Sequence, residues 1–216
     1  KDGMNYILDF EKIEQQYASG LKVHALCSPH NPLGRIYSRS ELTWIADMAK
    51  KYGVTVISDE IHAPLTFPGE EFIPFLSVNQ NAADVGICVN SASKAFNIAG
   101  LKSAIIISQS PAMHELLATM PMSVHFRSSI LGAFAAVVAF NDGDEWLDAA
   151  LSTIESNAHY LKTLLSTHIP AAKYEIPKCS YLAWVDVADL NLGEDPANIF
   201  LEKGRVAFNA GKIYGP

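Results

Sequence analysis

The sequence predicts an α/β protein, in which a mostly parallel sheet lies between layers of helices. Short apolar runs rich in β-branched residues recur in the first half, and a stretch with helical periodicity separates two of them. Because these runs do not alternate apolar and polar residues, both faces of the strands should be covered, which is typical of parallel sheets. Of the 216 residues, 49% are hydrophobic and 18% are charged, a globular rather than disordered balance.

The elements of the first half follow in order. A first strand is predicted over 23–27, and turn residues come directly after it. A capping-box pattern at 38–41 predicts the start of a helix. Two lysines in the expected last turn and Gly53 directly after it predict where the helix ends. Further strands are predicted over 54–58, 85–89 and 104–107.

The second half of the chain is mostly helical. The run 130–140 is apolar on all sides, which predicts a helix buried in the interior. A long amphipathic helix is predicted over 145–167. Beyond Pro170 the pattern changes, so we expect a domain boundary between about 143 and 170. The elements expected after this change are short strands over 174–176 and 181–187 and a short helix over 196–203.

Charge and cysteine content argue against several classes of protein. The net charge of −7 disfavours nucleic acid or an anionic membrane surface as the main partner. The longest apolar run is shorter than the roughly 20 residues that span a bilayer. The first 20 residues are polar, so no secretory leader is expected. Neither the three separate cysteines nor the seven scattered histidines form a metal-binding pattern, and we expect a cytoplasmic protein without a metal.

Three polar clusters each follow an apolar run. In parallel sheets, ligands bind beyond the carboxyl ends of the strands, so the three clusters should converge on one crevice. Together they supply an amide, a carboxylate, an imidazole, a lysine and two hydroxyls, a set that suits an anionic, aromatic, electron-accepting cofactor better than hydrolysis. The clusters are Ser-Pro-His-Asn-Pro-Leu-Gly-Arg at 28–35, Ser-Asp-Glu-Ile-His at 58–62 and Ser-Ala-Ser-Lys at 91–94.

In this order, the motifs His-Asn-Pro-x-Gly-Arg, Ser-Asp-Glu-Ile-His and Ser-x-Ser-Lys-x-Phe-Asn-x-x-Gly-Leu resemble those of the fold-type I pyridoxal-5′-phosphate (PLP) enzymes. They are most similar to the MalY/PatB-like cystathionine β-lyases, which are relatives of the class I/II aminotransferases. The resemblance runs from about Asn5 to Pro216 and implies the aspartate aminotransferase fold. It also implies that 1–150 is part of the large PLP-binding domain and that 151–216 is a truncated part of the small C-terminal domain.

The resemblance implies a role for each of seven residues. Lys94 would be the Schiff-base lysine that holds PLP and later moves the α-proton of the substrate, and both tasks need a neutral amine. Asp59 would face the pyridine nitrogen and keep it protonated, so that the ring accepts electrons. Asn31 would donate a hydrogen bond to the phenolic oxygen of the cofactor.

The other four residues would complete the cradle of the cofactor. His62 stands where many aminotransferases carry a tyrosine near the phenolic oxygen, and a packed core histidine is the alternative. Ser91 and Ser93 would bind the phosphate through hydroxyls and backbone amides. Lys102 stands where the wider family has a phosphate-binding arginine, so it keeps the charge but not the bidentate fork. The segment 181–184 resembles a strand of the small domain, which core packing explains as well as substrate contact does.

The implied activity is cleavage of cystathionine or related cysteine S-conjugates to thiol, pyruvate and ammonia by a homodimer that binds small amino-acid substrates. An aminotransferase, which shares the first steps, and a non-catalytic aminotransferase-like sensor domain are the alternatives. His62 and the subgroup resemblance favour the lyase. The resemblance also implies a fragment, because the ring-stacking aromatic and the carboxylate-binding arginine of the family cannot be placed in the chain. We therefore expect this stretch alone to bind PLP weakly.

Overall fold

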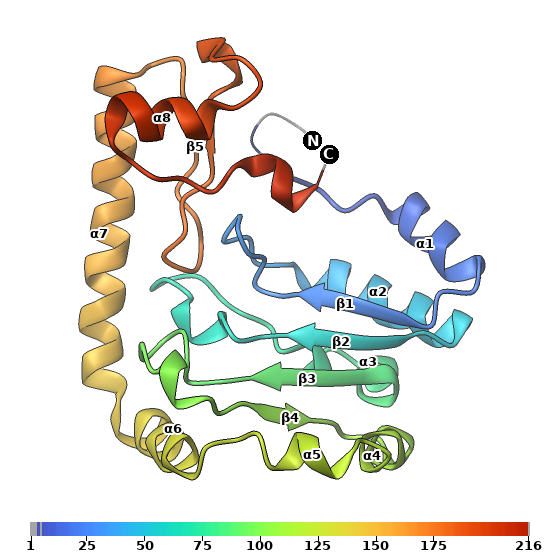
Figure 1. The fold of residues 1–216 in the computed structure, drawn as a ribbon. Coiled ribbons are helices and arrows are strands. Elements are labelled where there is room, and N and C mark those ends of the chain that lie inside the picture. The colour runs from blue at the N-terminus through green and yellow to red at the C-terminus, as the bar shows by residue number, and fades with distance from the viewer. Residues whose placement is uncertain (1–3, 5, 216) are drawn as a thin grey trace.

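The structure of the chain is a computed structural model that describes residue 4 and residues 6–215, with His125 described through its backbone only. A four-stranded sheet forms the body, and a long helix, α7, runs along one side of it (Figure 1). The C-terminal elements lie at the far end of α7 (Figure 1). Among the described residues, none of the helices is long and apolar enough to cross a bilayer.

The sheet is mostly parallel, as predicted. Its first three strands run parallel, and the fourth is antiparallel to the third. Cys27 pairs with Asp59 across the first two strands, and Asp59 pairs with Val89 across the next two. The carboxyl ends of all three parallel strands therefore meet at one edge. In spatial order the strands are β1 (Val23–Cys27), β2 (Thr55–Asp59), β3 (Gly86–Asn90) and β4 (Ile105–Ile107).

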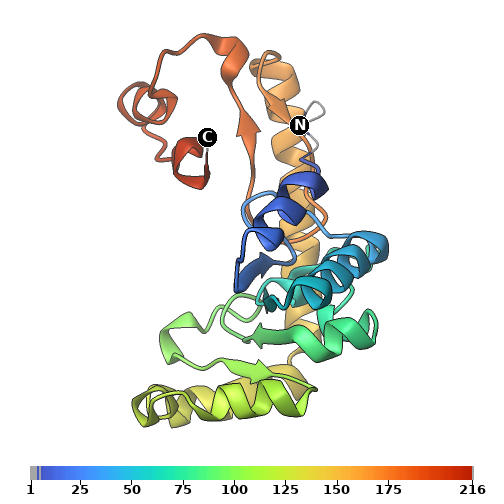
Figure 2. The same ribbon diagram turned by 90° about the vertical axis from the view of Figure 1, so that its right-hand side faces the viewer.

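Three helices cover one face of this sheet (Figure 2). Their apolar sides form the larger core with the first strands, and Phe75, Ile45 and Val56 are fully buried in it. Burial of each such side chain contributes about 1.5–3 kcal/mol to folding. The helices are α1 (Phe10–Ala18), α2 (Arg39–Tyr52) and α3 (Gln80–Val85).

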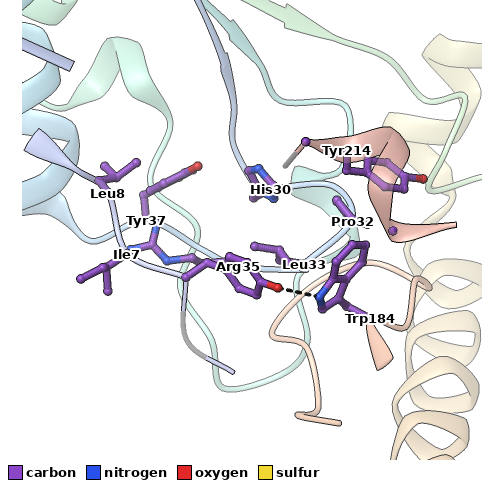
Figure 3. Close-up of a pocket in the computed structure, with 12 residues that line it drawn as sticks. Ile7, Leu8, His30, Pro32, Leu33, Arg35, Tyr37, Trp184 and Tyr214 are labelled. Carbon is purple, nitrogen blue, oxygen red and sulfur yellow. Dashed lines mark hydrogen bonds between the residues drawn. The ribbon is translucent and has the colours of Figure 1, made fainter. Parts of the chain in front are cut away.

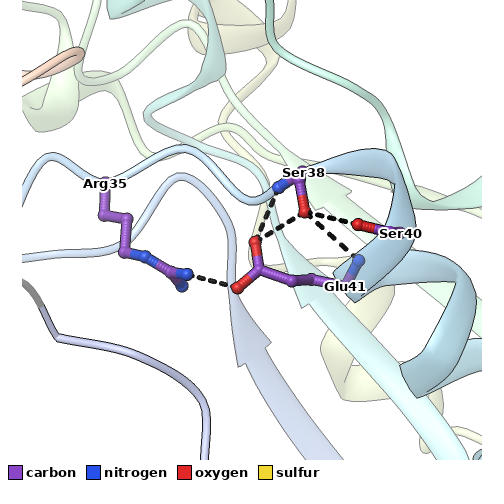
Figure 4. A network of polar contacts seen from close by, with 4 residues as sticks. All are labelled: Arg35, Ser38, Ser40 and Glu41. Atoms are coloured by element: carbon purple, nitrogen blue, oxygen red, sulfur yellow. Dashed lines mark hydrogen bonds and ion pairs between the residues drawn. The ribbon is translucent and has the colours of Figure 1, made fainter.

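The predicted capping box at the start of α2 is confirmed. The Ser38 side chain accepts a hydrogen bond from the backbone N–H of Glu41, and the Glu41 carboxylate accepts one from the backbone N–H of Ser38 at 2.8 Å (Figure 4). Arg35 forms an ion pair with the same carboxylate (Figure 4). At the other end, Gly53 adopts a left-handed conformation (φ 67°), and its N–H donates to the carbonyl of Ala49.

The prediction that the apolar helix at 130–140 is buried is wrong in this structure. The helix, α6 (Ile130–Asp142), buries only its small residues Gly132 and Ala136, while Ile130 and Phe134 are 71% and 66% exposed. Gly132 lies so close to Leu101 that a Cβ would stand 2.2 Å from the Leu101 carbonyl oxygen. Every side of α6 is apolar in the sequence, so the sequence pattern does not show which side is buried. The helix buries the side with its smallest residues, because that side packs closely against the body of the protein.

The remaining elements complete the two ends of the molecule. The predicted long helix is α7 (Asp144–His168), which packs Leu151 and Ala158 inward and spans the position of the expected domain boundary. Beyond it, β5 and β6 form an antiparallel pair that is shorter than the predicted strands. These elements are α4 (Pro111–Ala118), α5 (Met122–His125), β5 (Lys173–Tyr174), β6 (Val185–Asp186), α8 (Pro196–Gly204), and the 3-10 turns η1 (Ala63–Leu65), η2 (Phe75–Ser77), η3 (Ala99–Leu101), η4 (Ala188–Leu190) and η5 (Gly211–Tyr214).

A smaller core joins the two halves of the chain. Leu65 and Ala95 come from segments that follow β2 and β3, Leu151 comes from α7, and Cys179 comes from the segment between β5 and β6. Next to this core, Gly34 (φ 60°) packs so closely against Pro177 and Cys179 that a Cβ would stand 2.3 Å from the Pro177 Cβ. The backbone N–H of Lys178 donates to the Gly34 carbonyl at 3.0 Å. Only glycine fits this contact.

Loss of the α2 cap should lower stability. We predict that Ser38→Ala reduces the free energy of unfolding by about 1 kcal/mol, because the N–H of Glu41 loses its acceptor. The matched control is Ser40→Ala, since the Ser40 hydroxyl bonds to the Ser38 hydroxyl and to no other group of the described residues. Urea unfolding of the two variants measures the difference, and equal losses would contradict this account of the cap.

Two glycines with similar backbone angles should respond differently to alanine. Gly34 and Gly53 both have positive φ, but a Cβ on Gly53 would meet nothing within 4 Å. We predict that Gly53→Ala costs about 1 kcal/mol from backbone strain alone. Gly34→Ala should cost roughly 1–3 kcal/mol more, because its methyl group overlaps Pro177 and the Cys179 carbonyl. Equal melting temperatures for the two variants would show that the Gly34 contact does not limit stability.

Candidate active site

The three polar clusters predicted from the sequence lie together beyond the carboxyl ends of the parallel strands. Backbone hydrogen bonds continue the strand pairing into them: the N–H of Ser28 donates to the Asp59 carbonyl at 3.0 Å, and the N–H of Glu60 donates to the Val89 carbonyl at 2.9 Å. The expected convergence is therefore present in the backbone. The side chains of the second and third clusters also interact, because His62 feels the charges of Asp59 and Lys94.

The cluster after β1 forms a tight loop that presents Asn31. The backbone N–H of His30 donates to the Arg35 carbonyl at 2.8 Å, and the N–H of Gly34 donates to the His30 carbonyl at 2.7 Å. The peptide bonds that precede Pro29 and Pro32 are cis. Asn31 is exposed, and its backbone N–H donates to the Cys27 sulfur at 3.3 Å. The amide side chain of Asn31 is thus free to meet a ligand at the edge of the sheet.

The two acids after β2 have different environments. Asp59 is half-buried, and one of its carboxylate oxygens accepts the backbone N–H of Ile61 at 3.2 Å. Glu60 is only 3% exposed, and one oxygen accepts hydrogen bonds from the Ser58 hydroxyl and the Phe75 N–H, both at 2.9 Å. Glu60 therefore anchors the segment to the core, while Asp59 keeps an accessible carboxylate. The anchoring role of Glu60 was not predicted from the sequence.

His62 is buried without a hydrogen-bond partner for its ring. It is 3% exposed, and neither Nδ1 nor Nε2 has a partner among the described residues. Burial lowers the pKa of His62, and the positive charge of Lys94 lowers it further, while Asp59 acts in the opposite direction. The imidazole is therefore neutral at pH 7. An unpaired buried polar group costs free energy, so two such nitrogens in one ring point to a ligand.

The cluster after β3 is a turn held by serine hydroxyls. The Ser91 hydroxyl donates to the Ser103 carbonyl at 2.6 Å and accepts the backbone N–H of Ser93 at 3.1 Å. Because the single proton of Ser91 goes to Ser103, the Ser93 hydroxyl, 2.7 Å from that of Ser91, donates to it. Ser93 and Lys94 are half-buried, and Lys94 forms no ion pair with a described residue. The turn thus leaves the Lys94 amine available.

Lys102 is tied to this turn through the backbone only. It ends η3 in a left-handed conformation (φ 54°), and its carbonyl accepts the N–H of Ser129 at 3.1 Å. The next residue, Ser103, accepts the hydrogen bond from Ser91. The Lys102 side chain is exposed, and no contact within the described part of the chain joins it to Ser91 or Ser93. The structure brings six of the seven candidates to one edge of the sheet and leaves the Lys102 side chain outside their contacts.

A pocket adjoins this site but does not include it. Its volume is about 370 Å³, and the loop residues His30, Pro32 and Arg35 form one wall opposite Trp184 and Tyr214 (Figure 3). The seven candidate residues are absent from its lining. Two of its polar groups are engaged, because the Trp184 indole donates to the hydroxyl of Tyr6 at 3.0 Å and Arg35 pairs with Glu41. The Nδ1 atom of His30 is buried and has no hydrogen-bond partner among the described residues. We therefore place the candidate site at the three clusters, where the reactive groups gather.

Comparison with known proteins identifies the family of the chain. Residues 2–212 match the model of the aminotransferase class I and II family. The chain is 36% identical to cystathionine beta-lyase PatB of Bacillus subtilis, over 100% of this chain and 56% of that protein. It superposes on cystalysin from Treponema denticola, which contains pyridoxal 5′-phosphate, with a TM-score of 0.89 and 32% identity over 100% of this chain and 55% of that chain. The PLP-bound C-S lyase from Staphylococcus hominis superposes with a TM-score of 0.86 and 32% identity, over 96% of this chain and 54% of that chain.

The chain spans about half the length of the curated relatives that it matches. Over that half, the solved structures share its arrangement of strands and helices, which confirms the predicted α/β, PLP-dependent transferase-like fold. The family model covers nearly every residue, and the relatives include the cystathionine β-lyase subgroup suggested by the three motifs. The chain therefore belongs to the aminotransferase class I and II family.

Proposed function

We propose that the full-length protein is a PLP-dependent carbon–sulfur β-lyase that cleaves cystathionine or a related cysteine S-conjugate. The observation that carries this proposal is the convergence of a lysine, a carboxylate and an unpaired imidazole at Lys94, Asp59 and His62 beyond three parallel strands. The names of the relatives support it, because PatB is a cystathionine beta-lyase and the Staphylococcus hominis protein is a C-S lyase.

The residues of the site fit PLP. The buried ring of His62 has no hydrogen-bond partner among the described residues, and a polar cofactor at this edge would supply one. The amine of Lys94 forms no ion pair with a described residue, and the Asp59 carboxylate accepts a single backbone hydrogen bond. When bound, PLP supplies an electron-accepting ring that stabilises negative charge on the substrate's α-carbon.

Each residue then has a specific task. Lys94 Nζ would hold the cofactor covalently and, once released, would take the proton from the substrate's α-carbon, which requires the neutral amine. The Asp59 carboxylate would keep a proton on the pyridine nitrogen through a charge-assisted hydrogen bond. The Asn31 amide, from the cluster after β1, and the neutral His62 ring, from the cluster after β2, would both bind the phenolic oxygen of the cofactor. Loss of the α-proton would allow the β-thiolate to leave and take up a proton, which gives the thiol. The remaining three-carbon amino acid, 2-aminoacrylate, would react with one water molecule to give pyruvate and ammonia.

The turn at 91–94 would bind the phosphate group. Because the Ser91 hydroxyl already donates to Ser103, it fixes the turn. The Ser93 hydroxyl would give up its bond to Ser91 and, with nearby backbone amides, donate to the phosphate. The exposed Lys102 side chain would add positive charge from the next segment. Under this proposal 1–150 is part of the PLP-binding domain, 151–216 is part of the small domain, and the protein is a cytoplasmic homodimer.

Replacement of Lys94 should abolish turnover. We predict that Lys94→Ala in the full-length protein lowers the rate of thiol and pyruvate release from cystathionine by at least about 10²–10⁴-fold, because the α-proton loses its acceptor. The control is Lys51→Ala, which removes an exposed lysine paired with Glu14 on the far side of α2. The parent and the control should react without any keto acid. Strict dependence on 2-oxoglutarate would contradict the lyase and favour an aminotransferase.

A further inference from the structure

A segment from the C-terminal part of the chain packs directly on the residues around His62. The backbone N–H of Ser180 donates to the Leu65 carbonyl at 3.0 Å, and the N–H of Phe67 donates to the Lys178 carbonyl at 3.0 Å. The thiol of Cys179, which is fully buried, donates to the carbonyl of His62 at 3.1 Å. These bonds fix the backbone on both sides of residue 179 against the segment that contains η1, which His62 directly precedes.

The backbone at Ser180 is strained in a way that directs the next side chain. Ser180 has φ 76°, is 2% exposed, and has no partner for its hydroxyl among the described residues. A non-glycine residue in this conformation is strained and persists only where its surroundings hold it there. The hydrogen bonds on either side do so here. Their result is that the ring of Tyr181 lies beside the ring of His62.

The rings of Tyr181 and His62 form an aromatic contact. Their centroids are 6.0 Å apart and their planes are inclined by 54°. Because neither nitrogen of His62 has a hydrogen-bond partner among the described residues, packing rather than hydrogen bonding fixes the orientation of this ring. Tyr181 is itself 47% exposed, so it covers His62 on one side and faces solvent on the other.

We propose that Tyr181 is a positioning residue, which holds the His62 imidazole in the orientation that meets the cofactor beside Lys94. This inference rests on the proposed function. The groups that face His62 are Asp59 at the end of β2, Lys94 after β3, and Cys179 and Tyr181 from the C-terminal segment. Of these, Tyr181 alone contributes a ring contact to the imidazole without competing for its nitrogens.

Two substitutions separate the ring of Tyr181 from its hydroxyl. In the full-length protein, Tyr181→Ala should raise the pKa of His62, measured by NMR titration of the imidazole, because water reaches the ring and reduces the desolvation. It should also lower kcat/KM for cystathionine by about 10–100-fold, since His62 is no longer held in place. Tyr181→Phe keeps the ring and should leave the pKa of His62 at the value that it has in the parent protein.

The matched control is Tyr160→Ala on α7, a tyrosine that is 62% exposed. It should leave the His62 titration unchanged. A second variant, Ser180→Gly, tests the backbone: glycine adopts φ 76° without strain, so the variant should fold while Tyr181 gains freedom, and the pKa of His62 should again rise. If Tyr181→Ala does not fold, the titration of His62 in Ser180→Gly tests the proposal in its place.

An unchanged His62 titration in Tyr181→Ala and Ser180→Gly would overturn the proposal. So would a shift in Tyr181→Phe equal to that in Tyr181→Ala, because the hydroxyl rather than the ring would then be responsible. The NMR measurement does not need turnover, so it distinguishes this proposal from the proposed function. Should the parent protein fail to release thiol and pyruvate, the lyase assignment falls, and the titrations of the cofactor-free protein still decide the role of Tyr181.

Discussion

The parallel pairing of β1, β2 and β3 is the constraint on which the site depends. The pairing does not stop at the last strand residues, because Ser28 and Glu60 each extend it by one backbone hydrogen bond into the polar clusters. Groups that are about 30 residues apart in sequence are therefore held at one edge of a rigid sheet. Parallel strands place their carboxyl ends together, and ligands in open α/β sheets bind there.

A second set of contacts closes the site from the C-terminal side. Gly34 provides the space for Pro177 and Cys179, and the same segment then binds the backbone around His62. One short stretch thus connects the loop of Asn31 with the buried imidazole. The strain at Ser180 and the unpaired nitrogens of His62 lie in the same small region. Costs of this kind persist at functional sites, where ligand binding offsets them.

Local signals predicted much of this structure. The capping box of α2, the three parallel strands and the long helix α7 follow from short-range patterns that act within a few residues, and the order of the clusters predicted one common crevice. What sequence patterns do not contain is the direction of packing. They could not show that α6 buries its glycine side, that Glu60 rather than Asp59 is anchored in the core, or that Ser180 is left-handed, because each depends on partners distant in the chain.

The most direct test of the central claim is chemical trapping of the cofactor on Lys94. The full-length protein would be incubated with PLP, reduced with borohydride, digested, and examined by mass spectrometry. The account predicts that the pyridoxyl mass is found on the peptide that contains Lys94 and that it disappears in Lys94→Ala. Labelling of another lysine, such as Lys102, or no stable labelling at all, would contradict the placement of the active site at the three clusters.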